Sequence, residues 1–298
     1  MRKLQIRKII NITLIILCAA FIALTAYLSV EQERREEVYQ EIGNSGDLVI
    51  ASLNVGKADA ALLSYRDTLG IIDTGTKDAY NLIDQILSAN KKRVIDYMII
   101  THYDKDHIGS AVRLLEKYEV KALYLPDYVS AKAGYGKIRE AAEGLNHVVY
   151  VSKEETLTLE DLALRIIPAE DPVSLIADPD TMDNNMSLLC MVTLKDRKFL
   201  FTGDIKQSRI EQILESKDDV KADWLKVPYH GAYESGSRDF LSAVSPQYAV
   251  ISTGSERPAD ARMLVALTEQ NIQFFNTMNG SVVTISDGKD IAVRYLEQ

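Results

Sequence analysis

Apolar and polar positions follow two different patterns along the chain, and the change between them falls near residue 47. No charged residue occurs from Ile9 to Val30, and these 22 residues would extend roughly 33 Å as a helix, enough to cross the hydrocarbon core of a bilayer. Beyond residue 47, short apolar runs typical of buried strands alternate with stretches whose apolar residues recur at helical spacing. The pattern therefore predicts a membrane anchor followed by an α/β domain.

The expected elements of this domain can be read from the same runs. Strands are predicted near 48–55, 59–65, 69–73, 97–101, 123–125, 148–151, 163–168, 188–194, 198–203, 223–228, 248–252 and 282–286. Helices are predicted near 80–87, 111–118, 130–143, 207–215, 236–243 and 259–270. Two sheets, each covered by helices on its outer face, would bury all of these runs.

The charges that flank the apolar span indicate its orientation. Segment 1–8 contains four basic residues and no acidic residue, whereas acidic residues are in excess in segment 31–37. By the positive-inside rule, segment 1–8 is cytoplasmic, 9–30 is the transmembrane anchor, 31–47 is a polar stalk, and the domain at 48–298 lies outside the cell membrane. A cleaved signal peptide is the alternative, but the span is long for one and no A-x-A site follows it.

Candidate metal ligands gather at the ends of three predicted strands. The segment His102-Tyr103-Asp104-Lys105-Asp106-His107 follows an apolar run and contains two of the four histidines of the chain. Asp204 ends a second run, and His230 ends a third. Imidazole and carboxylate groups together suit a divalent metal ion. One site assembled from several strand ends explains the recurrence better than three unrelated loops, although the first segment alone could be a polar loop that caps a helix.

Five segments of the domain follow one another in an informative order. They are 51–60, 71–75, Thr101–Gly109, Thr202-Gly203-Asp204 and 227–231. In this order they resemble the DVGQGDA, IDTG, THxHxDHxGG, TGD and VPHHGS motifs of the metallo-β-lactamase superfamily, and more narrowly of the hydrolase-like domain of competence DNA-uptake channel proteins. The resemblance implies an αββα four-layer sandwich after the N-terminal transmembrane helix, with its site at one edge between the sheets.

The resemblance also implies two neighbouring positions for divalent metal ions. The ligands of the first would be His102 and Asp104, with Asn185 as a weak oxygen ligand. Those of the second would be Asp106, His107 and His230, with Asp204 bridging both positions. The second position suits Zn²⁺ or Mn²⁺, and the oxygen-rich first position favours Mn²⁺ or Mg²⁺. We expect one or two ions, and we expect Asp106 to be the catalytic residue that orients or deprotonates the water.

The chain departs from the family motifs at several positions. Asp104 stands where the first motif has its second histidine, Asn185 where many members have a further histidine, and Tyr229 where VPHHGS has its first histidine. Arg257 stands where the group has a late histidine–proline pair. Lys226, Tyr229 and Arg257 are candidates for contacting a substrate anion. Because the changes remove nitrogen ligands, a catalytically impaired binding or assembly module is an alternative to an enzyme.

Net charge bears on the substrate. The net charge of the whole chain is −9. Its first thirty residues carry +4, so residues 31–298 carry −13. Such a domain repels long nucleic acid unless a local basic patch opposes the field. The sequence thus predicts an outward-facing, membrane-anchored, metal-dependent hydrolase of phosphodiester bonds, either small ones or those of nucleic acid. A metal hydrolase of another ester or amide bond in the cell envelope is a further alternative, and no protein partner is indicated.

Overall fold

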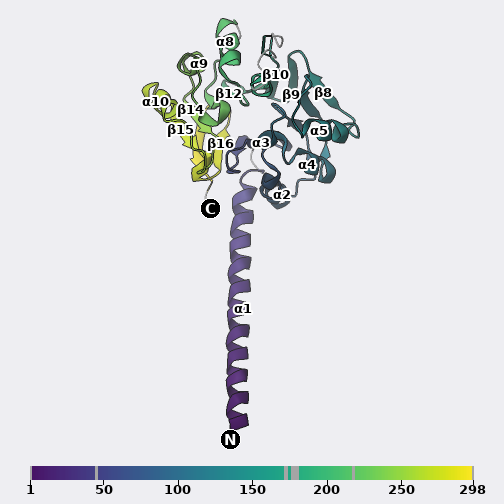
Figure 1. The fold of residues 1–298 in the computed structure, drawn as a ribbon, viewed down its shortest axis with the longest axis vertical. Helices are drawn as coiled ribbons and strands as arrows, with labels where there is room; N and C mark the ends of the chain where they lie inside the picture. Colours follow the sequence, from purple (N-terminus) through teal and green to yellow (C-terminus); the bar gives the residue numbers. More distant parts are fainter. Residues whose placement is uncertain (1, 44–45, 171–173, 176–180, 217–218, 297–298) are drawn as a thin grey trace.

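The structure is a computed structural model that describes residues 2–43, 46–170, 174–175, 181–216 and 219–296. A long helix, α1 (Arg2–Gln40), projects from a domain made of two sheets and their covering helices (Figure 1). By length and composition, Ile16–Gln40 could cross a membrane, and none of its most apolar window is buried. Asn44 and Ser45, which belong to the predicted polar stalk, lie outside the described residues.

The end of α1 is attached to the domain. Val38 and Tyr39 pack against the core, and Asn90 donates a hydrogen bond from Nδ2 to the Tyr39 carbonyl oxygen at 2.8 Å. Beyond the helix, Ile42 is fully buried, and Glu41 pairs with Arg294 at 2.5 Å. These contacts join the helix directly to the domain.

Two sheets form the centre of the domain. The first has the strand order β17-β16-β1-β2-β3-β5-β7-β8. Its bounds are β1 (Leu48–Ser52), β2 (Ala60–Tyr65), β3 (Thr68–Thr74), β5 (Tyr97–Ile99), β7 (Leu123–Pro126), β8 (Val148–Val151), β16 (Val282–Ser286) and β17 (Ile291–Tyr295). The second has the order β15-β14-β13-β12-β11-β10-β9. Its bounds are β9 (Glu155–Leu159), β10 (Leu162–Ile167), β11 (Leu189–Leu194), β12 (Arg197–Phe201), β13 (Trp224–Lys226), β14 (Tyr248–Ile251) and β15 (Gln273–Asn276). A separate pair joins β4 (Val94–Ile95) to β6 (Glu119–Val120).

Helices cover the outer face of each sheet, and three apolar clusters hold the layers together. The described helices are α2 (Tyr80–Ala89), α3 (Lys105–Ile108), α4 (Ala111–Lys117), α5 (Tyr135–Ala142), α7 (Met182–Asn185), α8 (Gln207–Glu215), α9 (Ser237–Val244) and α10 (Ala261–Glu269), with short 3-10 turns η1 (Lys77–Ala79), η2 (Pro228–Gly231) and η3 (Thr277–Asn279). One cluster lies between the sheets and includes Ile50 and Trp224. The second joins the first sheet to α2, α4 and α5, and the third joins the second sheet to α8, α9 and α10. The expected αββα four-layer sandwich is therefore confirmed.

The strands that the hydrophobic pattern failed to predict are mostly edge strands. β17, β15 and β9 occupy three of the four edges of the two large sheets. In β9 and β17 half-buried and exposed positions alternate, so neither strand forms a continuous apolar run. An edge strand packs less of its surface than a central strand, which weakens the sequence signal. The helix expected over 130–143 is shorter, because α5 begins only at Tyr135.

Candidate metal centre

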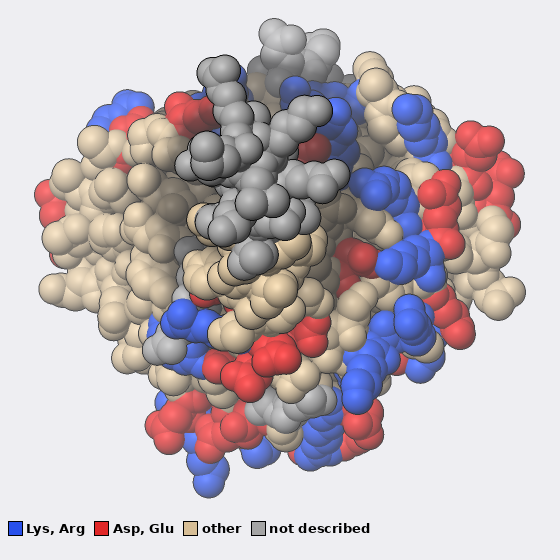
Figure 2. Space-filling view, turned by 90° about the horizontal axis from the view of Figure 1, so that it is seen from below, with Lys and Arg blue, Asp and Glu red and all other residues tan. Residues whose placement is uncertain are grey.

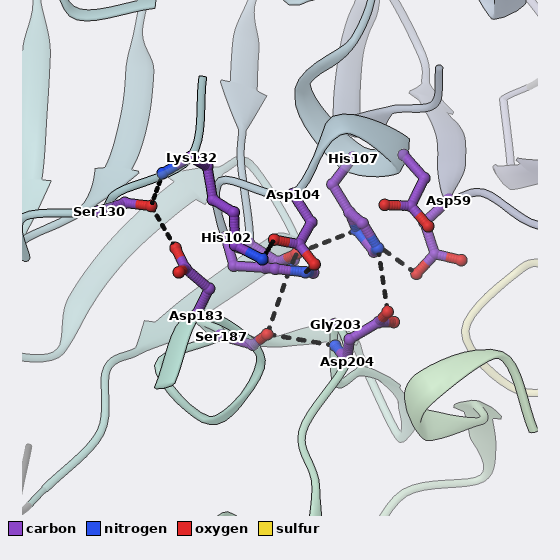
Figure 3. A network of polar contacts seen from close by, with 12 residues as sticks. Asp59, His102, Asp104, His107, Ser130, Lys132, Asp183, Ser187, Gly203 and Asp204 are labelled. Carbon is purple, nitrogen blue, oxygen red and sulfur yellow. Dashed lines mark hydrogen bonds and ion pairs between the residues drawn. The ribbon is translucent and has the colours of Figure 1, made fainter. Parts of the chain in front are cut away.

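The predicted ligands come from both sheets and meet between them. Figure 3 shows four of them, which are His102, Asp104, His107 and Asp204. His102 and Asp104 follow β5 of the first sheet, and Asp106 and His107 lie in α3 directly after them. From the second sheet, Asp204 follows β12 and His230 lies in η2, after β13. Residues far apart in sequence thus form one cluster, because each follows a strand that ends at the same side of the sandwich.

Three buried imidazoles direct their Nε2 atoms into this cluster. Nε2 of His102, His107 and His230 makes no hydrogen bond, although buried polar atoms are normally paired. His107 Nε2 lies 3.3 Å, and His230 Nε2 3.0 Å, from Asp204 Oδ2. Asp106 Oδ2 is 3.5 Å from His230 Nε2, and Asp104 Oδ2 is 3.9 Å from His102 Nε2. Unpaired nitrogens that converge with carboxylates form a donor set that fits a divalent metal ion.

The opposite nitrogen of each imidazole is held by a supporting residue. His107 donates from Nδ1 to Asp73 at 2.8 Å, and His230 donates from Nδ1 to the Ser252 carbonyl oxygen at 2.8 Å. His102 Nδ1 lies 3.1 Å from the Thr101 hydroxyl and 3.3 Å from that of Ser187. Such contacts fix the tautomer and ring orientation of metal-binding histidines. Here they turn all three Nε2 atoms toward the same point.

The backbone of the site adopts conformations that only a well-packed environment maintains. Asp73, Tyr229 and His230 have positive φ angles of 56°, 47° and 53°, although none of them is glycine. At Gly109, a Cβ atom would lie 2.5 Å from the Lys105 carbonyl oxygen, so no side chain fits there. Sparsely populated conformations of this kind persist at functional sites, where the surrounding structure imposes them.

The histidines of the metal-free site differ in charge. Burial, and then the charge of His107, lower the pKa of His102 to about 4. Burial also lowers the pKa of His230, but Asp204 and Asp106 outweigh that effect and raise it to about 9. The pKa of His107 is likewise raised, because Asp204 and Asp73 outweigh burial. At neutral pH the metal-free protein therefore keeps His102 neutral and His107 and His230 protonated.

Two carboxylates in the site had no role assigned from the sequence. Asp73 supports His107, and Asp59 forms a close ion pair with Lys226. Both lie within the motif segments 51–60 and 71–75, and this location was the signal that could have identified them. Lys226 is only 4% exposed, and its Nζ lies 3.2 Å from Asp204 Oδ1. The structure therefore places Lys226 behind the ligands, and not at a surface where a substrate would reach it.

The remaining predicted residues lie around the cluster. Tyr229 is half-buried, with Lys206 Nζ 4.7 Å and Lys57 Nζ 5.4 Å from the centre of its ring. Arg257 is exposed, and its backbone pairs with Gly254. Asn185 Oδ1 accepts a hydrogen bond from the Lys206 backbone N–H at 2.9 Å. The Asn185 oxygen thus binds the backbone at the start of α8.

Comparisons with known proteins agree with this geometry. The profile of the family described as Metallo-beta-lactamase superfamily matches residues 53–255. ComE operon protein 3 of Bacillus subtilis is 26% identical over 82% of this chain and 34% of its own length. Recombination protein 2 of Haemophilus influenzae is 28% identical over 55% of this chain and 18% of its own length. The chain therefore spans about a third or less of these relatives, and its resemblance to competence proteins is confirmed.

One solved structure shows the same fold. The metallo-beta-lactamase fold protein YhfI of Bacillus subtilis superposes with a TM-score of 0.53 at 12% identity. The match covers 83% of this chain and 100% of YhfI. At this identity the likeness concerns the fold alone.

Proposed function

Because the chain belongs to the metallo-beta-lactamase superfamily, we propose that it is a membrane-anchored, metal-dependent hydrolase of phosphodiester bonds. The observation that carries this proposal is the convergence of three buried, unpaired Nε2 atoms with the carboxylates of Asp106 and Asp204. Together these residues would hold one or two divalent ions, either Zn²⁺ or Mn²⁺, with Mg²⁺ as a third candidate. When bound, such an ion lowers the pKa of a water molecule and stabilises the charge that develops on a phosphoryl group.

The two acidic residues would perform different tasks. Asp204 is buried between His107, His230 and Lys226, so its carboxylate holds the site together. The Asp106 side chain is 21% exposed and can reach a water molecule that enters from solvent. Burial raises the pKa of Asp106, but the neighbouring imidazoles of His230 and His107 outweigh burial and lower it. Asp106 is therefore ionised at neutral pH and would orient the attacking water by accepting its hydrogen bond.

The substrate is proposed from local charge. Lys57 and Lys206 bring two ammonium groups close to the ring of Tyr229, the residue that precedes His230. In a domain with a strong negative charge, this rim would favour an anion at the site. The name of the relative Recombination protein 2 points toward nucleic acid, whereas the overall charge favours short or small phosphodiesters over long duplex DNA.

The domain would lie outside the cytoplasmic membrane, anchored by residues 9–30. The basic segment 1–8 supports this orientation through the positive-inside rule. Figure 2 shows the face from which α1 emerges, where basic and acidic side chains are interspersed around the base of the helix. On the described part of this face basic side chains lie beside acidic ones, so attachment would depend mainly on the helix.

The activity is tested with the full-length protein in detergent, supplied with Mn²⁺ and a bis-nitrophenyl phosphate. Hydrolysis is expected, and Asp106→Asn should abolish it without changing the circular dichroism spectrum. His147→Ala is the matched control, because His147 packs against Tyr124 outside the metal centre. Activity that persists in Asp106→Asn, or disappears in His147→Ala, would locate the catalyst elsewhere. Bound metal without this activity would favour another ester or amide substrate, and the absence of metal would favour the non-catalytic module.

The proposed orientation has a separate test. Protease added to intact or wall-stripped cells should remove the domain at 48–298. Protection until lysis would contradict the orientation. A released soluble protein that lacks the apolar span would instead indicate a cleaved signal peptide.

A further inference from the structure

One lysine outside every sequence motif contacts the metal centre. Lys132 Nζ lies 2.7 Å from Asp104 Oδ1, and the two side chains are 41% and 21% exposed. Asp104 is the residue that replaces the second histidine of the first motif. We propose that the Lys132 ammonium group takes the place of the metal ion in the first of the two positions. The protein would then bind a single ion, held by Asp106, His107, Asp204 and His230. This inference rests on the proposed function.

The donors left on the first side do not form a complete ligand set. Among the described residues, the groups of three donors within 4.8 Å of one another include His102 with His107 and Asp204, but none includes Asp104. One carboxylate oxygen of Asp104 faces Lys132, and the other is 3.9 Å from His102 Nε2. The Asn185 oxygen already accepts a backbone hydrogen bond. With the ion pair intact, Asp104 offers a first ion only the oxygen that does not face Lys132, beside His102 and the shared Asp204.

The segment that carries Lys132 is held in place by its own polar network (Figure 3). The Lys132 backbone N–H donates to the Ser130 hydroxyl at 3.1 Å, and Ser130 donates in turn to Asp183. Tyr128 donates to the same Asp183 oxygen at 2.9 Å. Asp183 is only 4% exposed and lies two residues before Asn185. Asp183 thus lies in the region where many members of the family place a histidine. In this chain it helps to position Lys132 through Ser130.

Charge explains why the lysine and a first metal ion exclude each other. Asp104 and Lys132 neutralise one another, whereas a divalent ion beside His102 would face an ammonium group a few ångström away. Asp104 can compensate only one of these cations. The ammonium group has three N–H donors, and those that Asp104 does not use are available to a phosphoryl oxygen. Lys132 would thus supply part of the positive charge that the first ion supplies in relatives with two ions.

The inference is tested by counting ions in the full-length protein. Wild type, Lys132→Met, Lys132→Arg and Lys137→Met are dialysed to equilibrium against Mn²⁺, and manganese per chain is measured by elemental analysis. Lys137 is an exposed lysine of α5, so its variant makes the same charge change at a neighbouring position. We expect one ion per chain in wild type, Lys132→Arg and Lys137→Met, and two in Lys132→Met. Electron paramagnetic resonance should show an isolated Mn²⁺ in wild type and a spin-coupled pair in Lys132→Met.

The outcomes separate this inference from the proposed function. Two ions in wild type would overturn the role of Lys132 and leave a metal hydrolase in place. One ion in both wild type and Lys132→Met would show that the lysine does not exclude the second ion, and would also overturn the inference. A second ion in Lys137→Met would mean that net charge, and not the Asp104 pair, controls occupancy. No ion in wild type would refute the proposed function and the inference together.

Discussion

The two sides of the metal centre have similar supports but different chemistry. Each side has imidazoles whose Nδ1 atoms are held and whose Nε2 atoms are free. On one side His107 and His230 meet Asp106 and Asp204, and their carboxylates keep both imidazoles protonated in the metal-free protein. On the other side His102 is alone and neutral, and Asp104 is paired with a lysine. The comparison shows that similar supporting contacts can hold imidazoles in two different electrostatic environments.

The largest effect is expected from the residue that both sides share. Asp204→Ala removes the carboxylate nearest to the Nε2 atoms of both His107 and His230, so the protein should lose its bound metal. Activity should fall by more than the roughly 100-fold typical of removing a supporting residue. Elemental analysis and phosphodiester turnover measure the two effects, and circular dichroism confirms that the variant is folded. Normal metal content in this variant would show that neither side depends on Asp204.

The residues that converge between the sheets could be identified from the sequence, but the residues that support them largely could not. His102, Asp204 and His230 combine infrequent or chemically distinctive residue types with positions at the ends of apolar runs. Lys132 has no such signal, because it lies in a loop with no motif, and its contact with Asp104 depends on tertiary packing through Ser130. Contacts of this kind arise from the fold and leave no local pattern.

Lys226 shows which information the sequence lacks. It was a candidate for contacting a substrate anion, but a buried lysine is normally paired, and in the structure Lys226 is buried. The partner that stabilises its burial is Asp59, which lies on a distant loop of the other sheet. The sequence places Asp59 within a recognised segment and Lys226 directly before another, but it does not show that the two residues meet. The layers of the sandwich were easier to predict, because each long central strand is itself a continuous apolar run in the sequence.

The second prediction compares the sides directly. His230→Ala should greatly reduce the affinity for Mn²⁺, because His230 is a ligand of the position that we expect to be filled. His102→Ala should leave one ion bound with an affinity close to that of wild type. Isothermal titration calorimetry measures both affinities. Equal losses in the two variants would mean that the sides are equivalent and that the comparison is wrong.

The third prediction concerns pH and has a definite sign. In the metal-free protein the pKa of His230 is raised from 6.5 to about 9, so its charged form stabilises the fold fully below pH 6.5, and this contribution is lost as the pH rises through about 9. Metal binding needs the neutral imidazole, so affinity should rise by about tenfold per pH unit for each proton displaced. His102, with a pKa of about 4, should release no proton in this range.

Calorimetry between pH 6.5 and 8.5, in buffers with different ionisation enthalpies, counts the protons that metal binding releases. Release is expected in wild type and should persist in His102→Ala. An affinity that does not change with pH would contradict the assignment of His107 and His230 as the ligands of the filled position.

The smallest effect is expected where the first side is converted back toward the family motif. Asp104→His replaces an oxygen ligand by a nitrogen ligand and removes the partner of Lys132. The preference for Zn²⁺ over Mn²⁺ should rise, but by no more than about tenfold, because the unpaired ammonium group then repels an ion at that position. Competition between the two metals in equilibrium dialysis measures the preference, with Asp127→His as an exposed control of the same chemistry. If Asp104→His combined with Lys132→Met raises zinc binding far more than Asp104→His alone, the lysine is what keeps the two sides different. If the two variants bind zinc equally well, the difference between the two sides is due to the ligands and not to Lys132.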